Sequence, residues 1–493
     1  MSMHGASPGF PAFPMGVAER SWKDESIALG GSDDCRVCIH EKLVLLLEGR
    51  PIRDPALSRR LGTSGDNPLV DILEAYRRWG EDFPRYLQGD FAVALWDSEK
   101  RRLVLARDPG GYWPLHYWVC GNQFRFASEA RELLANGDIP LAANPLRIAQ
   151  WLSMLPDTSG STFFQSILSV PPGHTVIWER GQVCVRDFWR PAEIPELRLA
   201  DPREYAEGLR SVLEEAVRSR IEDFSAVGSH LSGGLDSSSV TATAASLLRE
   251  RGGRVTAYTA VPTVAIDEGT FPRRFCDESS HAAATAALYP NVEHVLIPTI
   301  SGSLFETLDL MTSACESPQL NPGNSCWFRA ICTHAMSRGL RVMLTGANGN
   351  FTISYDGRRA LSSLIAGGRL VAAMRLGSAL RRGGAGWRRV MKAGVRPLLP
   401  AGLRRALDGF NSGDVLKMED ATGLRPEFAV SFGLNPQEAL ERADIREGRA
   451  LRTWSIRRND FGSHMAGLRR LTGVEQMDPT SDRRVMEFCL SVP

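Results

Sequence analysis

The feature that most restricts the fold of this chain is a glycine-rich turn, Ser232-Gly233-Gly234-Leu235-Asp236-Ser237-Ser238. It follows the apolar run SAVGSHL and precedes the helical pattern SVTATAASLL. Glycines let backbone N–H groups approach an anion closely, and a helix N-terminus adds the positive end of its dipole. No GK[ST] sequence follows, so the lysine of a Walker A loop is missing. The turn therefore predicts an α/β domain with a cradle for pyrophosphate.

This turn resembles the SGGxDS loop of ATP pyrophosphatases, in which pyrophosphate leaves as ATP becomes AMP. The resemblance implies that ATP and Mg²⁺ bind here, with Asp236 as the magnesium ligand. Ser232, Ser237 and Ser238 would donate to phosphate oxygens, and the backbone from Gly233 to Leu235 would complete the cradle. The alternative is a structural turn capped by serines. A match over the whole turn, in the right context, disfavours that alternative.

The 493-residue chain changes pattern near residue 195, which predicts domains over 1–195 and 196–493. Short apolar runs separated by turns dominate the first domain and indicate an antiparallel α+β unit. Its predicted elements are hairpins at 91–96 with 103–106 and at 175–178 with 183–185, and helices at 67–79 and 146–155.

The second domain alternates apolar runs with helical stretches, which is typical of a parallel sheet with helices on both faces. The predicted elements are a helix at 205–221 and strands at 226–231, 255–261, 294–297 and 341–344. Residues 358–410, rich in Arg, Gly and Ala, are interpreted as a lid or insertion.

Motifs spread over residues 35–490 resemble the asparagine synthetase family. The first-domain motifs are Leu87-Gln88-Gly89-Asp90-Phe91-Ala92, Trp96-Asp97, Ala106-Arg107-Asp108-Pro109-Gly110, Pro114-Leu115, Ser128-Glu129 and Pro171-Pro172-Gly173-His174. The second-domain motifs are the glycine-rich turn, Leu344-Thr345-Gly346, and Gly473-Val474-Glu475 followed by Asp478-Pro479 and Asp482. The resemblance implies a glutaminase-like Ntn-hydrolase sandwich joined to a nucleotide α-hydrolase domain. It also implies that Gly346 contributes to the ATP site.

Departures from this family refine the prediction. A working glutaminase of the family has a cysteine after the initiator methionine, whereas this chain has Ser2, and its first cysteine is Cys35. We therefore expect an inactive glutaminase domain, whose first residues do not resemble the family's first strand. The relatives also continue through helices that carry a basic catalytic residue, while this chain ends at Pro493, so no catalytic lysine is assigned.

The segment from Leu344 to Gly357, LTGANGNFTISYDG, resembles the signature of lasso-peptide macrolactam synthetases, the lasso cyclases. Ala347 and Asn350 stand where asparagine synthetases have a glutamate and a second magnesium-binding aspartate. The resemblance implies that an Asp or Glu side chain of a precursor peptide is adenylated and joined to the peptide's N-terminal amine. It also implies two partners, a leader-binding protein and a leader peptidase.

The catalytic candidates are Asp236, Asn350 and Glu316, with Asp236 as the metal ligand. Asp277 and Glu278 either lie near the nucleotide or act as acids at a helix N-terminus. The turn-rich segment 316–324 either lines a peptide pocket or is a plain connection. Three histidines without spaced partners are more typical of structural roles; they are His281, His294 and His334.

Other functions remain open at this point. A β-lactam synthetase or an ammonia-dependent asparagine synthetase would act on a small molecule, and a decayed synthetase would act as an interaction protein. With 58 basic and 57 acidic residues, no nucleic-acid partner is expected. The lack of an 18-residue apolar stretch predicts no stable membrane insertion. Nine cysteines in so long a chain are typical of a reduced, cytoplasmic protein.

Overall fold

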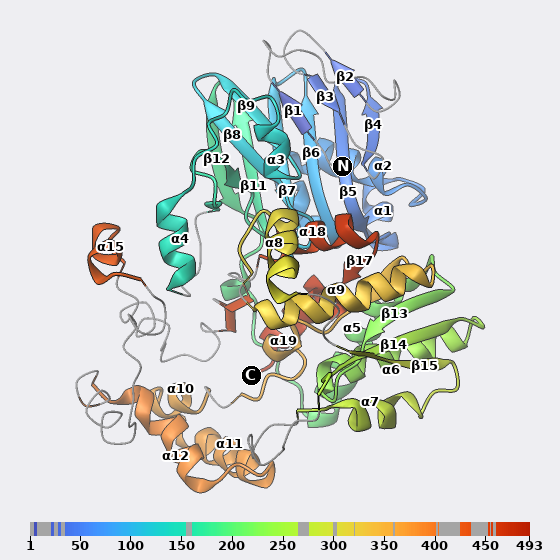
Figure 1. The fold of residues 1–493 in the computed structure, drawn as a ribbon, viewed down its shortest axis with the longest axis vertical. Helices are drawn as coiled ribbons and strands as arrows, with labels where there is room; N and C mark the ends of the chain where they lie inside the picture. Colours follow the sequence, from blue (N-terminus) through green and yellow to red (C-terminus); the bar gives the residue numbers. More distant parts are fainter. Residues whose placement is uncertain are drawn as a thin grey trace.

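The computed structural model shows a β-rich first domain above an α/β second domain in the view of Figure 1. The fold is described for residues 4–6, 21–23, 28–30, 35–153, 160–264, 276–298, 303–319, 321–357, 360–400, 403, 424–434, 452–453, 455–456 and 460–493.

The first domain holds two six-stranded antiparallel sheets. One has the order β10-β8-β9-β1-β3-β2, with β1 His4–Ala6, β2 Ser21–Lys23, β3 Ala28–Gly30, β8 His116–Cys120, β9 Gln123–Ala127 and β10 Leu168–Ser169. The other has the order β12-β11-β7-β6-β5-β4, with β4 Arg36–His40, β5 Leu43–Pro51, β6 Gly89–Asp97, β7 Arg102–Arg107, β11 His174–Glu179 and β12 Gln182–Asp187. Both predicted hairpins, β6–β7 and β11–β12, are confirmed.

Alternation along β5 explains how the layers of this domain pack. Val44 and Leu46 point into the sandwich, where they join Phe124 and Phe126 of the facing sheet. The other side of the strand packs under α1 (Pro55–Leu61), α2 (Pro68–Trp79) and η1 (Gly80–Tyr86), through Leu43, Leu45 and Leu47. Shorter helices are α3 Ala130–Leu134, α4 Pro145–Leu152 and η2 Pro191–Glu193. The predicted helix at 67–79 is confirmed, and the one at 146–155 ends three residues early.

Strand β1 is a departure from the sequence analysis, which identified no strand near His4. The segment pairs antiparallel with β9 on one side and β3 on the other. The hydrogen bonds to both neighbours stabilise this strand. The proline-rich, weakly patterned sequence around it does not predict a strand by itself.

The second domain is built on a parallel sheet of five strands in the order β15-β14-β13-β16-β17. Its strands are β13 Ala226–His230, β14 Arg254–Val261, β15 Val292–Pro298, β16 Val342–Leu344 and β17 Glu475–Met477. The four predicted strands are confirmed. The fifth, β17, has only one apolar residue in three and gives no periodic signal.

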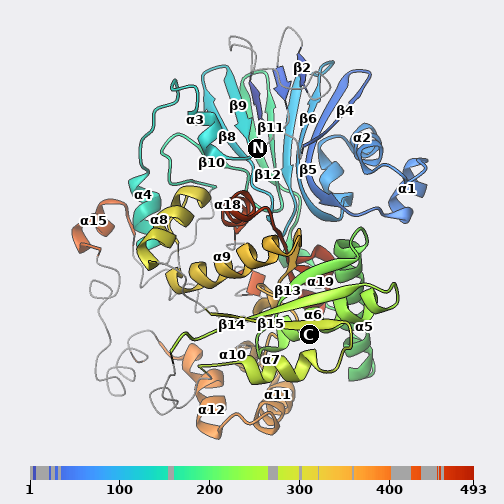
Figure 2. The same cartoon turned by 45° about the vertical axis from the view of Figure 1, so that its right-hand side comes forward.

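Helices cover both faces of this sheet, as predicted (Figure 2). One face carries α5 Pro202–Ile221, α6 Leu235–Arg249 and α7 Ser279–Ala286, and the other carries α8 Leu304–Cys315, α9 Pro322–Ser337 and α18 Gly462–Thr472. The last helix, α19 Arg483–Ser491, packs on α5. Short 3₁₀ turns are η4 Gly349–Phe351 and η6 Pro479–Ser481.

In the described part of the segment interpreted as a lid or insertion, three helices form a small cluster below the sheet in Figure 1. They are α10 Ala360–Ala366, α11 Leu370–Arg382 and α12 Trp387–Val395, followed by η5 Arg396–Leu398 and, later in the chain, α15 Pro426–Ser431. Residues 404–410 lie outside the described residues, and the lid stays a prediction. The position of the domain boundary also stays a prediction. Among the helices that the structure describes, none is long and apolar enough to span a membrane.

A buried arginine of the first domain joins it to the second. Arg107 in β7 is fully buried, and its guanidinium donates to both carboxylate oxygens of Asp460 at 2.9 Å. It also donates to the carbonyl oxygens of Trp113, Val170 and Gly111 at 2.6–2.7 Å. The guanidinium therefore makes five hydrogen bonds: three fix it within the first domain, and the two to Asp460 join it to the second.

A second buried network lies where α5 meets the first domain. Arg220 donates to Asp482 at 2.6 Å and to Asp90 of β6 at 2.7 Å. Burial alone would raise the pKa of Asp482, but the charges and hydrogen bonds of Arg220 and Arg484 outweigh it and lower the pKa to about 2. The Asp482 carboxylate therefore stabilises the fold above its ordinary pKa of 3.8, and this contribution is lost as the pH falls through about 2.

Candidate functional site

The glycine-rich turn lies between the end of β13 and the start of α6, as predicted. Ser237 Oγ accepts from the backbone N–H of Ser232 at 3.0 Å and lies 2.9 Å from Ser232 Oγ. Ser232 Oγ in turn accepts from the N–H of Gly234 at 3.1 Å. These two serines therefore hold the turn closed from within, and Ser238 bonds back to the same turn through the Ser232 carbonyl.

The N-terminus of α6 is open. Its cap residue, Gly234, has an extended backbone, and no side chain caps the helix. The first N–H groups of an α-helix have no partner within the helix, so this end presents free donors and the positive end of the dipole. Leu235, the first helical residue, is 75% exposed and leaves the approach from solvent open. The geometry suits an incoming phosphate group.

Asp236 is the half-buried carboxylate of this site. Its Oδ2 accepts from Ser354 Oγ at 3.1 Å, whereas its buried Oδ1 has no hydrogen-bond partner within the described part of the chain. Burial raises the pKa of Asp236, the hydrogen bond from Ser354 lowers it, and the charge of Asp478 raises it again, for a net increase. A buried carboxylate oxygen without a donor has unused capacity to bind a cation.

Two glycines make room for Asp236. A Cβ on Gly346 would lie 2.9 Å from the backbone carbon of Asp236, and a Cβ on Gly349 would lie 2.1 Å from its carboxylate carbon. Ser354 comes from the same segment, just after η4. The segment that resembles lasso cyclases is therefore packed directly against the predicted magnesium ligand. Gly346 was predicted from the sequence, whereas Ser354 and Gly349 were not, although both stand in the quoted signature.

Replacing Gly349 by Ala tests this packing. The backbone angles of Gly349 are open to alanine, so the expected effect comes from the clash of the new methyl with Asp236. We expect a loss of roughly 1–3 kcal/mol in the free energy of unfolding, which is the range for overpacking. Turnover should fall more than about tenfold because the carboxylate is displaced.

The matched control is Gly386→Ala, since a Cβ at Gly386 meets nothing within 4 Å. Urea unfolding and ATP turnover would be measured for both variants. Equal effects at Gly349 and Gly386 would show that the close approach to Asp236 does not matter.

Glu278 also belongs to the site. Its Oε2 accepts from the N–H of Gly233 at 3.2 Å, and a Cβ on Gly233 would lie 3.0 Å from His281. The turn thus already donates to one anionic oxygen, which is the kind of group it is predicted to bind. Asp277 instead bonds to Ser279, whose N–H it accepts from. Hydrogen bonds from the Ser279 side chain and backbone lower the pKa of Asp277. Of the two acids, the structure brings Glu278 to the turn and leaves Asp277 at the start of α7.

Asn350 and Glu316, the other catalytic candidates, have different surroundings. Asn350 is exposed on η4, next to the glycine that contacts Asp236. Glu316 ends α8 with a left-handed backbone, and its carboxylate accepts from the N–H groups of Ala130 and Arg131 at 2.8 Å. That places Glu316 at the first turn of α3 in the other domain. Both carboxylate oxygens are used in contacts between the domains, and a catalytic role for Glu316 stays a prediction.

The histidines have structural contacts. His294 Nε2 lies 2.8 Å from Thr259 Oγ1, and His334 packs edge-on against Tyr258.

Asp478, from the later family motif, is buried and accepts from the N–H of Asn348 and the hydroxyl of Tyr112. It therefore anchors the segment around Gly349 rather than facing the turn.

The residues present fit a magnesium ion that is held mainly by a nucleotide. No cluster of three or more His, Cys, Asp or Glu side chains suited to a metal occurs among the described residues. Magnesium bound with phosphates needs only one or two protein carboxylates. Asp236, with its unpartnered Oδ1 beside an open helix N-terminus, supplies one.

Comparison with known proteins covers both domains. The model of the glutamine amidotransferase domain matches residues 56–189, in agreement with the predicted Ntn-type sandwich. The asparagine synthase model matches residues 208–493, more than half of the chain.

Individual relatives match over shorter stretches. Amidase chry2 of Gibberella zeae is 29% identical over 307 residues, 60% of this chain and 44% of that protein. Amidase chyE of Penicillium rubens is 30% identical over 309 residues, with coverage of 60% and 44%. Asparagine synthetase 3 (glutamine-hydrolyzing) of Bacillus subtilis is 30% identical over 182 residues, 37% of this chain and 29% of that one. This chain spans less than half the length of these relatives.

Proposed function

Because the chain belongs to the asparagine synthase family, we propose that it uses ATP to adenylate a carboxylate and passes the acyl group to an amine. The observation that carries this proposal is the pairing of an open helix N-terminus with the unpartnered Oδ1 of Asp236. A phosphate cradle beside a free carboxylate suits a reaction in which pyrophosphate leaves as a magnesium complex.

The chain's own residues divide this work. The N–H groups at the start of α6 bind the leaving phosphates, while Ser232 and Ser237 fix the shape of the turn. Asp236 holds Mg²⁺, which when bound neutralises charge on the phosphates. Ser354 orients the Asp236 carboxylate through its hydrogen bond. The Glu278 carboxylate must release the backbone N–H of Gly233 before that N–H can bind a phosphate oxygen.

We further propose that the substrate is a precursor peptide, and that the product is a macrolactam between its N-terminal amine and an Asp or Glu side chain. Support comes from the segment that resembles lasso cyclases, since Gly346, Gly349 and Ser354 of that segment all contact Asp236. Holding amine and adenylate together makes ring closure an intramolecular step. The partners would be a leader-binding protein and a leader peptidase, and the reaction would take place in the cytoplasm.

The test incubates the full chain with MgATP, a cognate precursor peptide and the two partner proteins. We expect AMP and pyrophosphate in equal amounts, and a core peptide lighter by one water that resists carboxypeptidase. Release of ADP and phosphate would contradict adenylation. Adenylation of aspartate or of a β-amino acid, with every precursor left linear, would favour a small-molecule synthetase. Absence of any ATP cleavage would favour the decayed synthetase.

A further inference from the structure

A pocket of about 520 Å³ lies between the two domains, far from the glycine-rich turn. It is lined by the ends of β4 and β5 from the first domain, and by α18 and the starts of β16 and β17 from the second. Arg341 precedes β16 and Ser232 follows its parallel neighbour β13. The pocket is therefore at the amino ends of these strands, whereas the turn is at their carboxyl ends. We call this cavity the interdomain pocket.

Positive charge predominates in the interdomain pocket. Its charged side chains are Arg36, Arg50, Arg53, Arg341, Arg469, Arg470, Glu129, Glu222, Asp223 and Glu475. Six guanidinium groups face four carboxylates, which leaves an excess of two positive charges. Such an excess in a concave surface shared by two domains favours an anionic ligand, since a cleft lined by one sign of charge focuses the electrostatic field.

Only two of these arginines are neutralised by the pocket's own acids. Arg50 pairs with Glu475 at 3.2 Å and with Asp223 at 3.6 Å, and Arg470 pairs with Glu129. The other four make no ion pair with any residue that the structure describes; they are Arg36, Arg53, Arg341 and Arg469. Two of them come from each domain.

Two of the unneutralised arginines, Arg36 and Arg469, are held in place by other contacts. Arg36 donates to the carbonyl oxygen of Gly49 at 2.7 Å, and the guanidinium of Arg469 stacks 3.9 Å from the ring centre of Trp113. Burial and the positive charges of Arg50 and Arg53 lower the pKa of Arg36. These arginines therefore keep N–H donors available while repelling one another.

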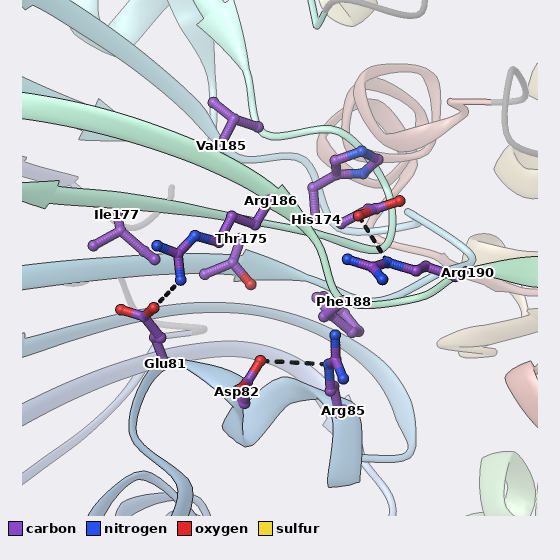
Figure 3. Close-up of a pocket in the computed structure, with 11 residues that line it drawn as sticks. Glu81, Asp82, Arg85, His174, Thr175, Ile177, Val185, Arg186, Phe188 and Arg190 are labelled. Atoms are coloured by element: carbon purple, nitrogen blue, oxygen red, sulfur yellow. Dashed lines mark hydrogen bonds and ion pairs between the residues drawn. The ribbon is translucent and has the colours of Figure 1, made fainter.

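A second pocket of similar size, on the first domain, has balanced charges. It has a volume of about 530 Å³ and lies beside β11 and β12 (Figure 3). Its three arginines all pair with its three acids: Arg85 with Asp82 at 3.4 Å, Arg190 with Asp187 at 3.1 Å, and Arg186 with Glu81. That pocket is neutral by itself, in contrast to the interdomain pocket.

We propose that the interdomain pocket binds a small ligand with two negative charges, of the dicarboxylate or phosphate-monoester class, that bridges arginines of both domains. Planar guanidinium groups bind carboxylate and phosphate with two parallel hydrogen bonds, which suits them to this role. The volume lies in the range of roughly 300–1,000 Å³ typical of small-molecule sites. The site is separate from the adenylating turn, and the inference does not depend on the proposed reaction.

The test is thermal unfolding of the full chain at constant ionic strength, with sodium succinate or inorganic phosphate titrated against sodium chloride. We expect either anion to raise Tm above the chloride control in a saturable way. Arg53→Gln and Arg341→Gln, one from each domain, should each weaken binding about tenfold or more. Both side chains are exposed, so the variants should fold. Arg218→Gln, an exposed arginine of α5 paired with Glu214, is the matched control and should bind normally.

Binding of succinate alone or of phosphate alone would support the site and identify the class of ligand. No shift above the chloride control would overturn the proposal, as would equal shifts in wild type and both pocket variants. Phosphate could also enter the glycine-rich turn. If saturating MgATP abolishes the phosphate shift and succinate gives none, the anion belongs to the turn and the proposal fails.

Discussion

Replacing Asp236 by Asn is expected to lower ATP turnover by about 100-fold or more while leaving the fold intact. The substitution keeps the size of the side chain and its hydrogen bond to Ser354, but removes the charge that the unpartnered Oδ1 would offer to magnesium. Loss of a single electrostatic contact of this kind costs roughly 10²–10³ in kcat. Because the carboxylate has a raised pKa, neutralising it should not destabilise the protein in the absence of metal.

The measurements are turnover as a function of Mg²⁺ concentration, together with urea unfolding. The control is Ser354→Ala, which keeps the charge and removes only the orienting hydrogen bond, so a smaller loss of about 10-fold is expected. That hydrogen bond lowers the pKa of Asp236, so Ser354→Ala should also move the acid limb of the pH–rate profile to higher pH. Unchanged turnover of Asp236→Asn at ordinary magnesium would remove Asp236 from the metal site.

Replacing Arg107 by Met is expected to cost about 3 kcal/mol or more in the free energy of unfolding, because three buried carbonyl oxygens lose their donor at roughly 1–3 kcal/mol each. Methionine fills much of the volume but leaves the carbonyl oxygens of Trp113, Val170 and Gly111, and the Asp460 carboxylate, without their donor. Each buried acceptor that loses its partner adds a desolvation cost.

The matched control is Arg102→Met in the same strand. Arg102 forms ion pairs with Glu179 and Glu81 near the surface, and such pairs contribute only about 0–1 kcal/mol. Urea unfolding of both variants gives the comparison. A cost at Arg107 no larger than at Arg102 would mean that the buried guanidinium does not hold the domains together.

Much of the fold was predictable because its signals are local. The hairpins, the strands β13 to β16 and the α5 helix all follow from runs of apolar residues with a clear period. The turn at 232–238 was predictable from glycines at fixed spacing between such runs. Strands β1 and β17 were not, because three residues carry no period and depend on neighbours far along the chain.

The part of the site that one segment supplies was the easiest to predict; beyond it, the sequence pointed to Gly346 and left two alternatives for Glu278. Asp236 and its serines lie in a single motif, whereas Ser354 and Glu278 reach the turn from 118 and 45 residues away. Glu316 has contacts that the sequence does not show. A conspicuous acid in a polar turn resembles a catalytic group in the sequence, and only the partner helix reveals that its oxygens bind the backbone of α3.

The link between Arg107 and Asp460 has a consequence for how the protein is made. The two residues are 353 positions apart. At roughly 5–20 residues per second, a ribosome needs about 20–70 s after adding Arg107 to reach Asp460, which carries the partner carboxylate. Once β12 has been made, the β-sandwich is complete in sequence, but until Asp460 follows it carries an interior cation without its counter-charge. The emerging amino-terminal half should therefore remain sensitive to proteases until the ribosome has released the segment that contains Asp460.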